Sequence, residues 1–472
     1  MAVDYDLVVI GHTIAGVHAA LQAAHFKARV ALVQQQCQPQ LSRHFALSTL
    51  TDAFEQIQRT HSLHGCDRLQ ENLHRDRASD VSSPAWANVN RWIDAIAQDQ
   101  QEIYSPALLA SAGVEVIFST GEFCRKPQTG FVVEGRVLRS RAYLIATNHR
   151  PRIPDIAGLH AVDYLTPDSP ITELPGSLAI ITHALAGVEL AQLYARLGTD
   201  VTLIVNQPQI LPTADPEIAF LLQAALETEG VRVANGKVMQ IDTVEDKKII
   251  QIGNQTINAD KVLIALGWES YLETLNLDAM NVRVPIKTNE KLQTTNSRVY
   301  YCGSFDVASA KYEAEIVVRN ALFFPKYTAK YTDTAKLALT DPEIAWIGLT
   351  ESHATELYGK DVIVLRRSFA TVLKPQIRSK TTGLCKLIVR RNGQILGAHL
   401  VGLNAGEILS AVAIAIQHRI KLQHLPTAFP SPTASEVIGQ LVSDWQAHPS
   451  RRDTVLRDCT ASLLAWLRSL SK

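Results

Sequence analysis

The chain has 472 residues, of which 46% are hydrophobic, so it holds enough apolar material for two to four domains of ordinary size. Its 46 lysine and arginine residues balance 46 aspartate and glutamate residues, and no basic block argues for nucleic acid as a partner. Six scattered cysteines without a C-x-x-C pair are typical of reduced thiols in a cytoplasm, not of a disulfide framework. No signal-peptide pattern or apolar run of ~20 residues is present. These features predict a cytoplasmic protein.

The N-terminal residues predict a strand, a glycine turn and a helix. The apolar, β-branched run 7–10 is typical of a buried parallel strand. Gly11 and Gly16 then hold the first and last glycine positions of the fingerprint G-x-G-x-x-G, in which backbone N–H groups at a helix N-terminus bind a pyrophosphate. Thr13 replaces the middle glycine and can offer its hydroxyl to a phosphate. Gln34, at the end of the next strand, replaces the acid that binds ribose hydroxyls.

Residues 37–85 form a polar segment in which Leu41 to Gln58 can be helical. A solvated segment is the favoured interpretation, because the spacing of its metal-ligating residue types does not meet the rules of a four-ligand site. Those residues are His61, His64, Cys66 and His74. We therefore predict no metal site. A long helical pattern from Trp86 to Ala112 follows, and Gly113 ends it.

The strand and helix pattern begins again after a linker near residue 150. Residues 178–182 predict a strand, 187–197 a helix and 201–205 another strand. The chain thus holds two copies of one nucleotide-binding architecture, with the second inserted within the first. From about Ala329 the pattern changes to an antiparallel sheet with accompanying helices, which is typical of an α+β domain. Its predicted strands are 362–368, 384–390 and 395–401.

Six stretches make the chain resemble the flavoprotein pyridine nucleotide–disulfide oxidoreductases, such as dihydrolipoamide dehydrogenase, glutathione reductase and mercuric reductase. They are 145–151, 264–267, 288–295, 301–304, 340–350 and 397–402, and the resemblance covers roughly residues 4–447. It implies an α/β fold with two nested Rossmann-like nucleotide-binding domains and a C-terminal α+β dimerisation domain. It also implies a homodimer in which the partner subunit completes each active site.

The resemblance divides the chain into four parts. Residues 1–150 and 272–328 are expected to form a discontinuous FAD-binding domain with a central piece. Residues 151–271 are expected to be an inserted NAD(P)-type domain, and residues 329–447 the dimerisation domain. The remaining residues, 448–472, are expected to be a helical tail.

The resemblance implies that FAD binds at the first fingerprint. Ser304 stands where the family has the acid that binds the ribityl chain, and Asn148 replaces a glycine. Both replacements are short and polar, so hydrogen bonds to FAD remain available although a charge is lost. We therefore expect FAD to bind. The residues assigned to it are Gly11, Thr13, Gly16, Gln34, Ala146, Thr147, Gly303 and Ser304.

The second nucleotide site is degenerate in sequence. Its fingerprint replaces the first two glycines with Thr182 and Ala184, and a β-carbon at these places obstructs the tight turn and the approach of a pyrophosphate. Gly187 and Glu189 match the family, in which the resemblance puts Glu189 beside nicotinamide and flavin. Val205 stands at the ribose-selecting position, where neither an acid nor an arginine is available. Tight NAD(P)H binding is therefore disfavoured.

The residues of the thiol–disulfide reaction are also changed. Active family members carry a C-x4-C pair, whereas this chain has Cys37 and then no cysteine until Cys66. With no basic neighbour to lower its pKa, Cys37 is interpreted as a bystander. The C-terminal H-P-x-x-x-E stretch of the family reads Ser431 to Glu436 here, so the acid–base histidine is a serine. Thiol–disulfide chemistry by the family route is not expected, and the catalytic residues stay unknown.

These changes predict an FAD-binding flavoprotein that transfers electrons through the flavin, with unknown donor and acceptor. A small redox protein or a hydrophobic acceptor could serve in that reaction. The alternative is a non-catalytic dimeric binding or scaffold protein that retains the fold, and a third interpretation puts another nucleotide in the inserted domain. The tail 453–472 has an apolar helical face. An arm packed on its own dimer is favoured there over contact with a membrane surface.

Overall fold

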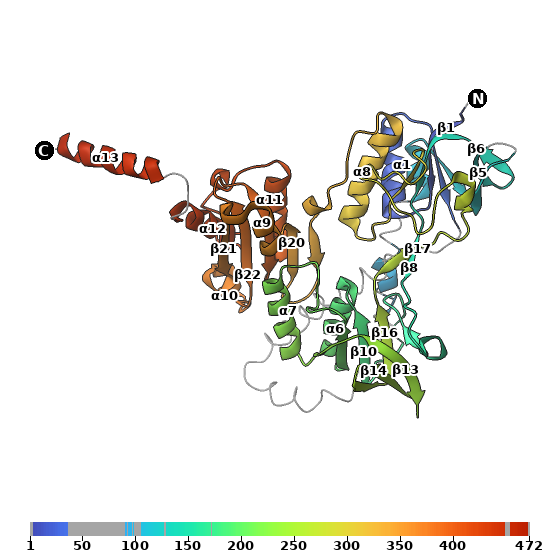
Figure 1. Ribbon diagram of the computed structural model, residues 1–472, viewed down its shortest axis with the longest axis horizontal. Coiled ribbons are helices and arrows are strands. Elements are labelled where there is room, and N and C mark those ends of the chain that lie inside the picture. The colour runs from blue at the N-terminus through green and yellow to red at the C-terminus, as the bar shows by residue number, and fades with distance from the viewer. Residues whose placement is uncertain are drawn as a thin grey trace. The chain divides into compact units, whose positions relative to one another are not determined.

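The computed structural model describes residues 3–35, 90–91, 93–96, 98, 105–126, 129–170, 172–448 and 454–470. The chain divides into two compact units (Figure 1). The first unit consists of residues 1–207 and 229–331, and the second of residues 208–228 and 332–472.

The first unit contains a five-stranded parallel sheet. Its strand order is β18-β7-β1-β2-β3, and helices α1 (Ile14–His25) and α8 (Val307–Leu322) lie side by side on one face (Figure 1). Its strands are β1 (Tyr5–Ile10), β2 (Val30–Gln34), β3 (Val114–Phe118), β7 (Ser140–Ile145) and β18 (Val299–Tyr301).

The apolar run of β1 is continuous because both faces of this sheet are covered. Leu7 and Val9 belong to the core beneath α1 and α8, whereas Val8 and Ile10 belong to a second core that includes Phe123. The second core lies under the antiparallel sheet β4 (Gly121–Cys124), β5 (Gly130–Val133) and β6 (Arg136–Leu138). The alternation fixes the register of β1, since a shift by one residue would exchange the two cores.

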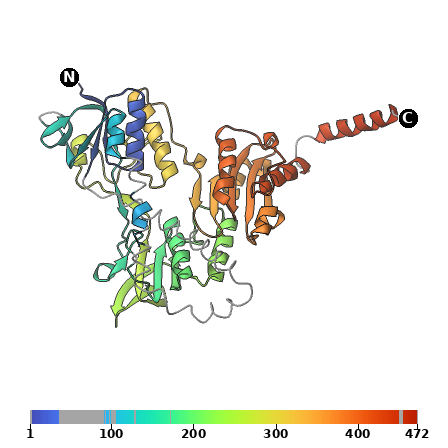
Figure 2. The same ribbon diagram turned by 180° about the vertical axis from the view of Figure 1, so that it is seen from behind.

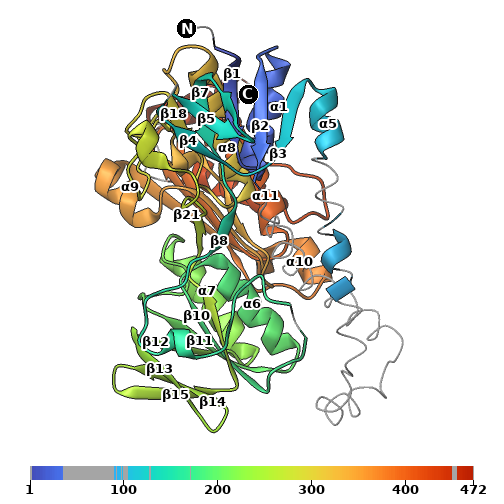
Figure 3. The ribbon, with the colours of Figure 1, turned by 90° about the vertical axis from the view of Figure 1, so that its right-hand side faces the viewer.

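A second parallel sheet follows in the chain, with order β12-β11-β10-β16-β9 and helix α6 (Leu185–Arg196) (Figure 3). An antiparallel sheet of three strands packs against it through a shared apolar core. The parallel strands are β9 (Tyr164–Leu165), β10 (Ser177–Thr182), β11 (Asp200–Val205), β12 (Arg232–Asn235) and β16 (Lys261–Ala265). The antiparallel strands are β13 (Val238–Val244), β14 (Lys247–Ile252) and β15 (Gln255–Ala259).

All these strands lie in the chain between β7 and β18 of the first sheet, so the predicted nesting of the two nucleotide-binding architectures is confirmed. The chain leaves the first sheet through β8 (His149–Pro151) and returns through β17 (Trp268–Ser270), which pair antiparallel. The short helix α5 (Pro106–Ser111) precedes β3.

An antiparallel sheet of order β19-β20-β23-β22-β21 forms the second unit, together with its helices (Figure 2). The strands are β19 (Lys336–Ala338), β20 (Ile344–Gly348), β21 (Val362–Ser368), β22 (Leu384–Arg390) and β23 (Ile395–Val401). The helices are α7 (Pro216–Thr228), α9 (Glu351–Tyr358), α10 (Leu373–Ile377), α11 (Ala405–Gln417), α12 (Glu436–Ala447) and α13 (Thr454–Leu470). Short 3-10 helices span 159–161, 277–280, 331–333, 359–361, 369–371 and 422–424 of the whole chain.

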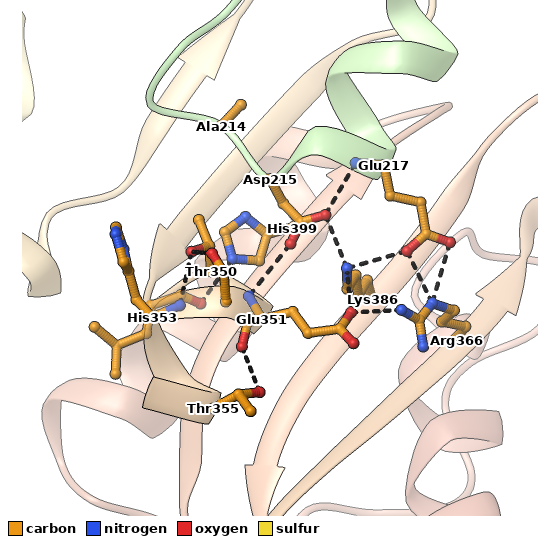
Figure 4. Close-up of polar contacts among 12 residues, drawn as sticks. Ala214, Asp215, Glu217, Thr350, Glu351, His353, Thr355, Arg366, Lys386 and His399 are labelled. Atoms are coloured by element: carbon orange, nitrogen blue, oxygen red, sulfur yellow. Dashed lines mark hydrogen bonds and ion pairs between the residues drawn. The ribbon is translucent and has the colours of Figure 1, made fainter. Parts of the chain in front are cut away.

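The buried ammonium group of Lys386 joins the start of α7 to this sheet (Figure 4). Its Nζ lies 2.8 Å from Asp215, 3.0 Å from Glu217 and 2.8 Å from Glu351. Arg366 pairs with both glutamates from the neighbouring strand. Asp215 also accepts a hydrogen bond from the backbone N–H of Glu217, so it caps α7 as well as holding the lysine.

The prediction of one continuous helix from Trp86 to Ala112 is wrong at Ser105, although α5 does end beside Ala112. Helical residues occur at 90–91, 93–96 and 98, but Ser105 has extended backbone and its hydroxyl accepts from Leu108 N–H. Pro106 then occupies the first helical position, so α5 is a separate helix. The segment Leu41 to Gln58 lies outside the described residues.

Helix α13 presents an exposed apolar face, whose packing on a dimer stays a prediction. The exposed side chains are Leu463, Leu464, Trp466, Leu467 and Leu470. Among the described residues, no helix has both the length and the apolar character that crossing a bilayer requires.

Candidate nucleotide-binding site

The turn between β1 and α1 requires both of the glycines that the fingerprint supplies. Gly11 has φ of +111°, and a Cβ there would lie 2.1 Å from the carbonyl oxygen of Ala146. A Cβ on Gly16 would lie 2.5 Å from the carbonyl oxygen of Gly11. The glycines therefore let three pieces of backbone meet where β1 and β7 end, at the carboxyl edge of the sheet.

Thr13 is the N-cap residue of α1, and its side chain is buried. Its hydroxyl accepts a hydrogen bond from Gly16 N–H at 3.3 Å and lies 3.0 Å from the carbonyl oxygen of Ala146, to which it donates. The hydroxyl hydrogen is therefore engaged within the protein. This differs from our expectation that Thr13 offers its hydroxyl to a phosphate, because the hydroxyl hydrogen is donated to the carbonyl oxygen of Ala146.

Three residues that end or follow strands β2 and β7 have a buried polar atom without a hydrogen-bond partner among the described residues. The atoms are Gln34 Oε1, Thr147 Oγ1 and His149 Nδ1. Buried polar groups are nearly always satisfied in native proteins, so unsatisfied ones at one site point to a missing ligand or water. A small cavity of about 10 Å³ beside Gly11 is lined by His12, Gln35, Thr147, Asn148 and Tyr271. The polar atoms fit the hydroxyl and phosphate groups of a dinucleotide.

His149, the first residue of β8, forms a hydrogen bond to the loop that follows β18. Its Nε2 lies 3.2 Å from the carbonyl oxygen of Gly303, and its ring meets Phe305 edge to face. Burial lowers the pKa of His149, so the ring is neutral at physiological pH. Phe305 in turn stacks on Trp268 at 4.3 Å. Trp268 also lines a cavity of about 600 Å³ that reaches Gly303, a volume in the range of ligand sites.

Ser304 follows Gly303 and binds a carboxylate from α8. Its hydroxyl lies 2.6 Å from Glu313 Oε1 and its backbone N–H 3.1 Å from Glu313 Oε2. Tyr331 donates a further hydrogen bond to Glu313 at 2.7 Å. Glu313 is 3% exposed. Sequence reasoning missed this arrangement, because Glu313 stands in a Lys-Tyr-Glu-Ala-Glu run that is typical of a solvated helix face.

In the second fingerprint, the side chain of Thr182 fills the space beside Gly187. A Cβ on Gly187 would lie 2.3 Å from Thr182 Oγ1, so the threonine occupies the space beside the start of α6. Its hydroxyl donates to the carbonyl oxygen of Ala265 at 2.7 Å and accepts from Ala184 N–H at 2.9 Å. An amide at the place where a pyrophosphate would bind is therefore already engaged. Glu189 and Val205, the other two residues assigned here, are buried.

Two of the described cysteines, Cys302 and Cys385, are fully buried and poorly suited to thiolate chemistry. Burial raises the pKa of Cys302 and of Cys385, and the charge of Glu313 contributes at Cys302. No group of three His, Cys, Asp or Glu residues in the described ranges could hold a metal ion. The metal-ligating residue types at 61, 64, 66 and 74, and Cys37, lie outside those ranges.

Of the two residues at the family's acid–base positions, Glu436 is the first residue of α12 and Ser431 lies in the segment before it. Ser431 is exposed, whereas Glu436 is partly buried and accepts a hydrogen bond from Thr433 N–H at 3.0 Å. The glutamate therefore holds the turn that precedes its own helix. A proton-transfer role for either residue stays untested.

Comparison with known proteins agrees with this architecture. Residues 5–322 match the family model for pyridine nucleotide-disulphide oxidoreductases, and residues 334–442 match the dimerisation domain of that family. A mercuric reductase of Staphylococcus aureus is 31% identical over 454 residues, which is 90% of this chain and 79% of the relative. A dihydrolipoyl dehydrogenase of Bacillus subtilis is 27% identical over 95% of this chain and 99% of the relative.

Solved structures show the same fold. The flavoprotein disulfide reductase RclA from Escherichia coli superposes with a TM-score of 0.75 at 20% identity, over 93% of this chain and 99% of that one. LpdA from Mycobacterium tuberculosis superposes with a TM-score of 0.78 at 20% identity, over 93% of this chain and 99% of LpdA. With a family model spanning most of the sequence and a relative at 31% identity over most of its length, the chain belongs to the pyridine nucleotide-disulphide oxidoreductase family.

Proposed function

We propose that this protein is an FAD-binding, homodimeric flavoprotein of its family that works without a redox disulfide and without a conventional NAD(P)H site. The observation that carries this proposal is the contrast between the two fingerprints. The first keeps Gly11 in its turn and leaves buried polar atoms of Gln34, Thr147 and His149 unsatisfied, whereas in the second Thr182 replaces the turn glycine and its hydroxyl binds Ala184 N–H.

The chain's own residues have defined parts in this proposal. The start of α1 and the Gly11 turn would hold the pyrophosphate, while Thr147, Gly303 and Ser304 would line the rest of the dinucleotide. When bound, FAD supplies a ring that takes up and releases electrons. The sequence contains no C-x4-C pair to pass those electrons to sulfur, and the buried thiols of Cys302 and Cys385 are protonated. Donor and acceptor therefore have to reach the flavin by another route.

A non-catalytic dimeric binding protein is the second candidate. Thr182 in the inserted domain and Ser431 at the acid–base position both favour it, because each removes a group that the family reaction uses. In this case FAD would be a structural ligand, or the first site would hold none.

The first experiment is an absorbance spectrum of the purified protein, followed by mass analysis of the small molecule that denaturation releases. We expect flavin bands and one FAD per chain, in a particle of twice the chain's mass by light scattering. A colourless dimer that also fails to bind added FAD would contradict the proposal and favour the binding protein. A colourless preparation that takes up FAD stoichiometrically would support it.

A further inference from the structure

The carboxylate of Glu313 is buried but has no cationic partner among the described residues. Three neutral groups donate to it: the hydroxyl and the backbone N–H of Ser304, and the hydroxyl of Tyr331. A buried carboxylate is costly unless it is paired or well hydrogen-bonded, and an ionised one has about four acceptor positions. Three are used here, so one position is available to a further donor.

The position of Glu313 follows from the topology. Ser304 comes three residues after β18 ends at the carboxyl edge of the parallel sheet, and its hydroxyl binds Glu313 in the second turn of α8. Ligands of open α/β sheets bind at this edge, where the strand order changes direction. That change falls between β1 and β7 in the order β18-β7-β1-β2-β3, and the fingerprint turn lies beside it.

The strand order also indicates which part of a dinucleotide Glu313 would meet. The end of β2, with Gln34, is where the adenosine ribose is bound in this architecture, and the pyrophosphate lies at the start of α1 after β1. In the other direction from β1, the next strands of the sheet are β7 and then β18. Three strand spacings of about 4.8 Å separate β2 from β18. In FAD the group beyond the pyrophosphate is the hydroxyl-bearing ribityl chain.

We propose that Glu313, held in place by Ser304 and Tyr331, is the acidic residue that accepts a hydrogen bond from the ribityl hydroxyls of bound FAD. This inference rests on the proposed function. It replaces the expectation that the site has lost its acidic residue: Ser304 carries no charge, but it holds a carboxylate supplied by α8. Charge-assisted hydrogen bonds are about twice as strong as neutral ones, which gives the acid its advantage over an amide.

The test compares the affinities of the apoprotein for FAD and for ADP, which ends at the pyrophosphate and lacks the ribityl chain. We expect Glu313→Gln to weaken the affinity for FAD about tenfold or more, since a charge-assisted hydrogen bond becomes a neutral one. The affinity for ADP should stay unchanged. Glu315→Gln, on the same helix but with its side chain 47% exposed, is the matched control and should change neither affinity. The double variant Ser304→Asp with Glu313→Gln returns a charge to the site and should recover most of the FAD affinity.

Each other outcome has a defined meaning. Unchanged FAD affinity in Glu313→Gln would overturn the inference, and an equal loss of FAD and ADP would show a general structural role and overturn it too. If Glu313→Gln does not fold, Glu313→Asp decides, because it keeps the charge but withdraws it by one methylene. The affinity for FAD should then fall while the affinity for ADP stays the same, and an unchanged FAD affinity would contradict the inference. Failure of the wild-type protein to bind FAD would instead contradict the proposed function.

Discussion

Lys386 is the residue whose charge we expect to matter most for stability. Its side chain is 3% exposed and contacts Asp215, which is 1% exposed, together with two partly exposed glutamates (Figure 4). Burial acts to lower the pKa of Lys386, but its hydrogen bonds to the carboxylates outweigh this and hold the pKa above its ordinary value. The lysine is therefore charged, and it neutralises carboxylates that are wholly or partly withdrawn from water.

Replacing this lysine should destabilise the second unit strongly. We expect Lys386→Met to lower the free energy of unfolding by about 3–5 kcal/mol, because Asp215 would stay buried without its cation. The matched control is Lys261→Met, which removes a 2.7 Å pair with Asp163 whose side chains are 35% and 69% exposed. That change should cost no more than about 1 kcal/mol. Urea unfolding followed by circular dichroism measures both, and equal losses would contradict the role given to Lys386.

The same cluster predicts a dependence of stability on pH. Burial acts to raise the pKa values of Asp215 and Glu217. Lys386 outweighs burial at Asp215, and Arg366 together with Lys386 outweighs it at Glu217, so both pKa values are lowered in the folded protein. Because the unfolded state then binds more protons, the stabilisation is present above the ordinary carboxyl pKa and is lost as the pH falls through the lowered values. We expect the unfolding free energy to decrease below about pH 5. The decrease should be smaller in Lys386→Met, and an identical profile would be evidence against the coupling.

Single residues set the limit of what the sequence could reveal about the site. Gly11 and Gly16 could be predicted because a turn of this kind excludes a side chain. Glu313 could not, since its burial depends on Ser304 and Tyr331, which come from outside its helix. Thr13 shows the same limit, because its identity reveals a hydroxyl but not which acceptor that hydroxyl reaches.

At the scale of elements, strands with apolar runs and clear turn signals were predicted best. The predicted strands 362–368, 384–390 and 395–401 have the same bounds in the structure. Strands β13 to β15 were not predicted, because many of their residues are exposed and each apolar run is short. The helix predicted to end at Ala112 failed because the capping group of Ser105 and the ring of Pro106 start a new helix regardless of periodicity.

The turn from β1 to α1 can be tested against a second glycine of similar conformation. Gly113 has φ of +90°, but no atom lies within 4 Å of the place that a β-carbon would take there, whereas a β-carbon on Gly11 would meet Ala146. We expect Gly113→Ala to cost about 1–2 kcal/mol from φ alone. Gly11→Ala should cost about 1–3 kcal/mol more, from overpacking. Calorimetric melting of the apoproteins compares them, and an equal loss would show that the close approach to Ala146 carries no energy.

At the scale of the whole molecule, the family's architecture is retained, and we propose that the groups used in its reaction are altered. The nested parallel sheets and the dimerisation domain are confirmed. The sequence could establish this much because apolar patterns and glycine turns depend on local chemistry. The donor and acceptor could not be predicted, since they depend on surfaces that no motif encodes.

The central claim is that electrons no longer pass from NAD(P)H through flavin to sulfur. Anaerobic stopped-flow mixing of the FAD-loaded protein with NADH, and separately with NADPH, tests it most directly. We predict that the flavin absorbance persists after mixing, because Thr182 occupies the start of α6, and that dithionite then bleaches it as a control. Rapid bleaching by either nucleotide, followed by reoxidation with a disulfide substrate at enzymatic speed, would contradict the account.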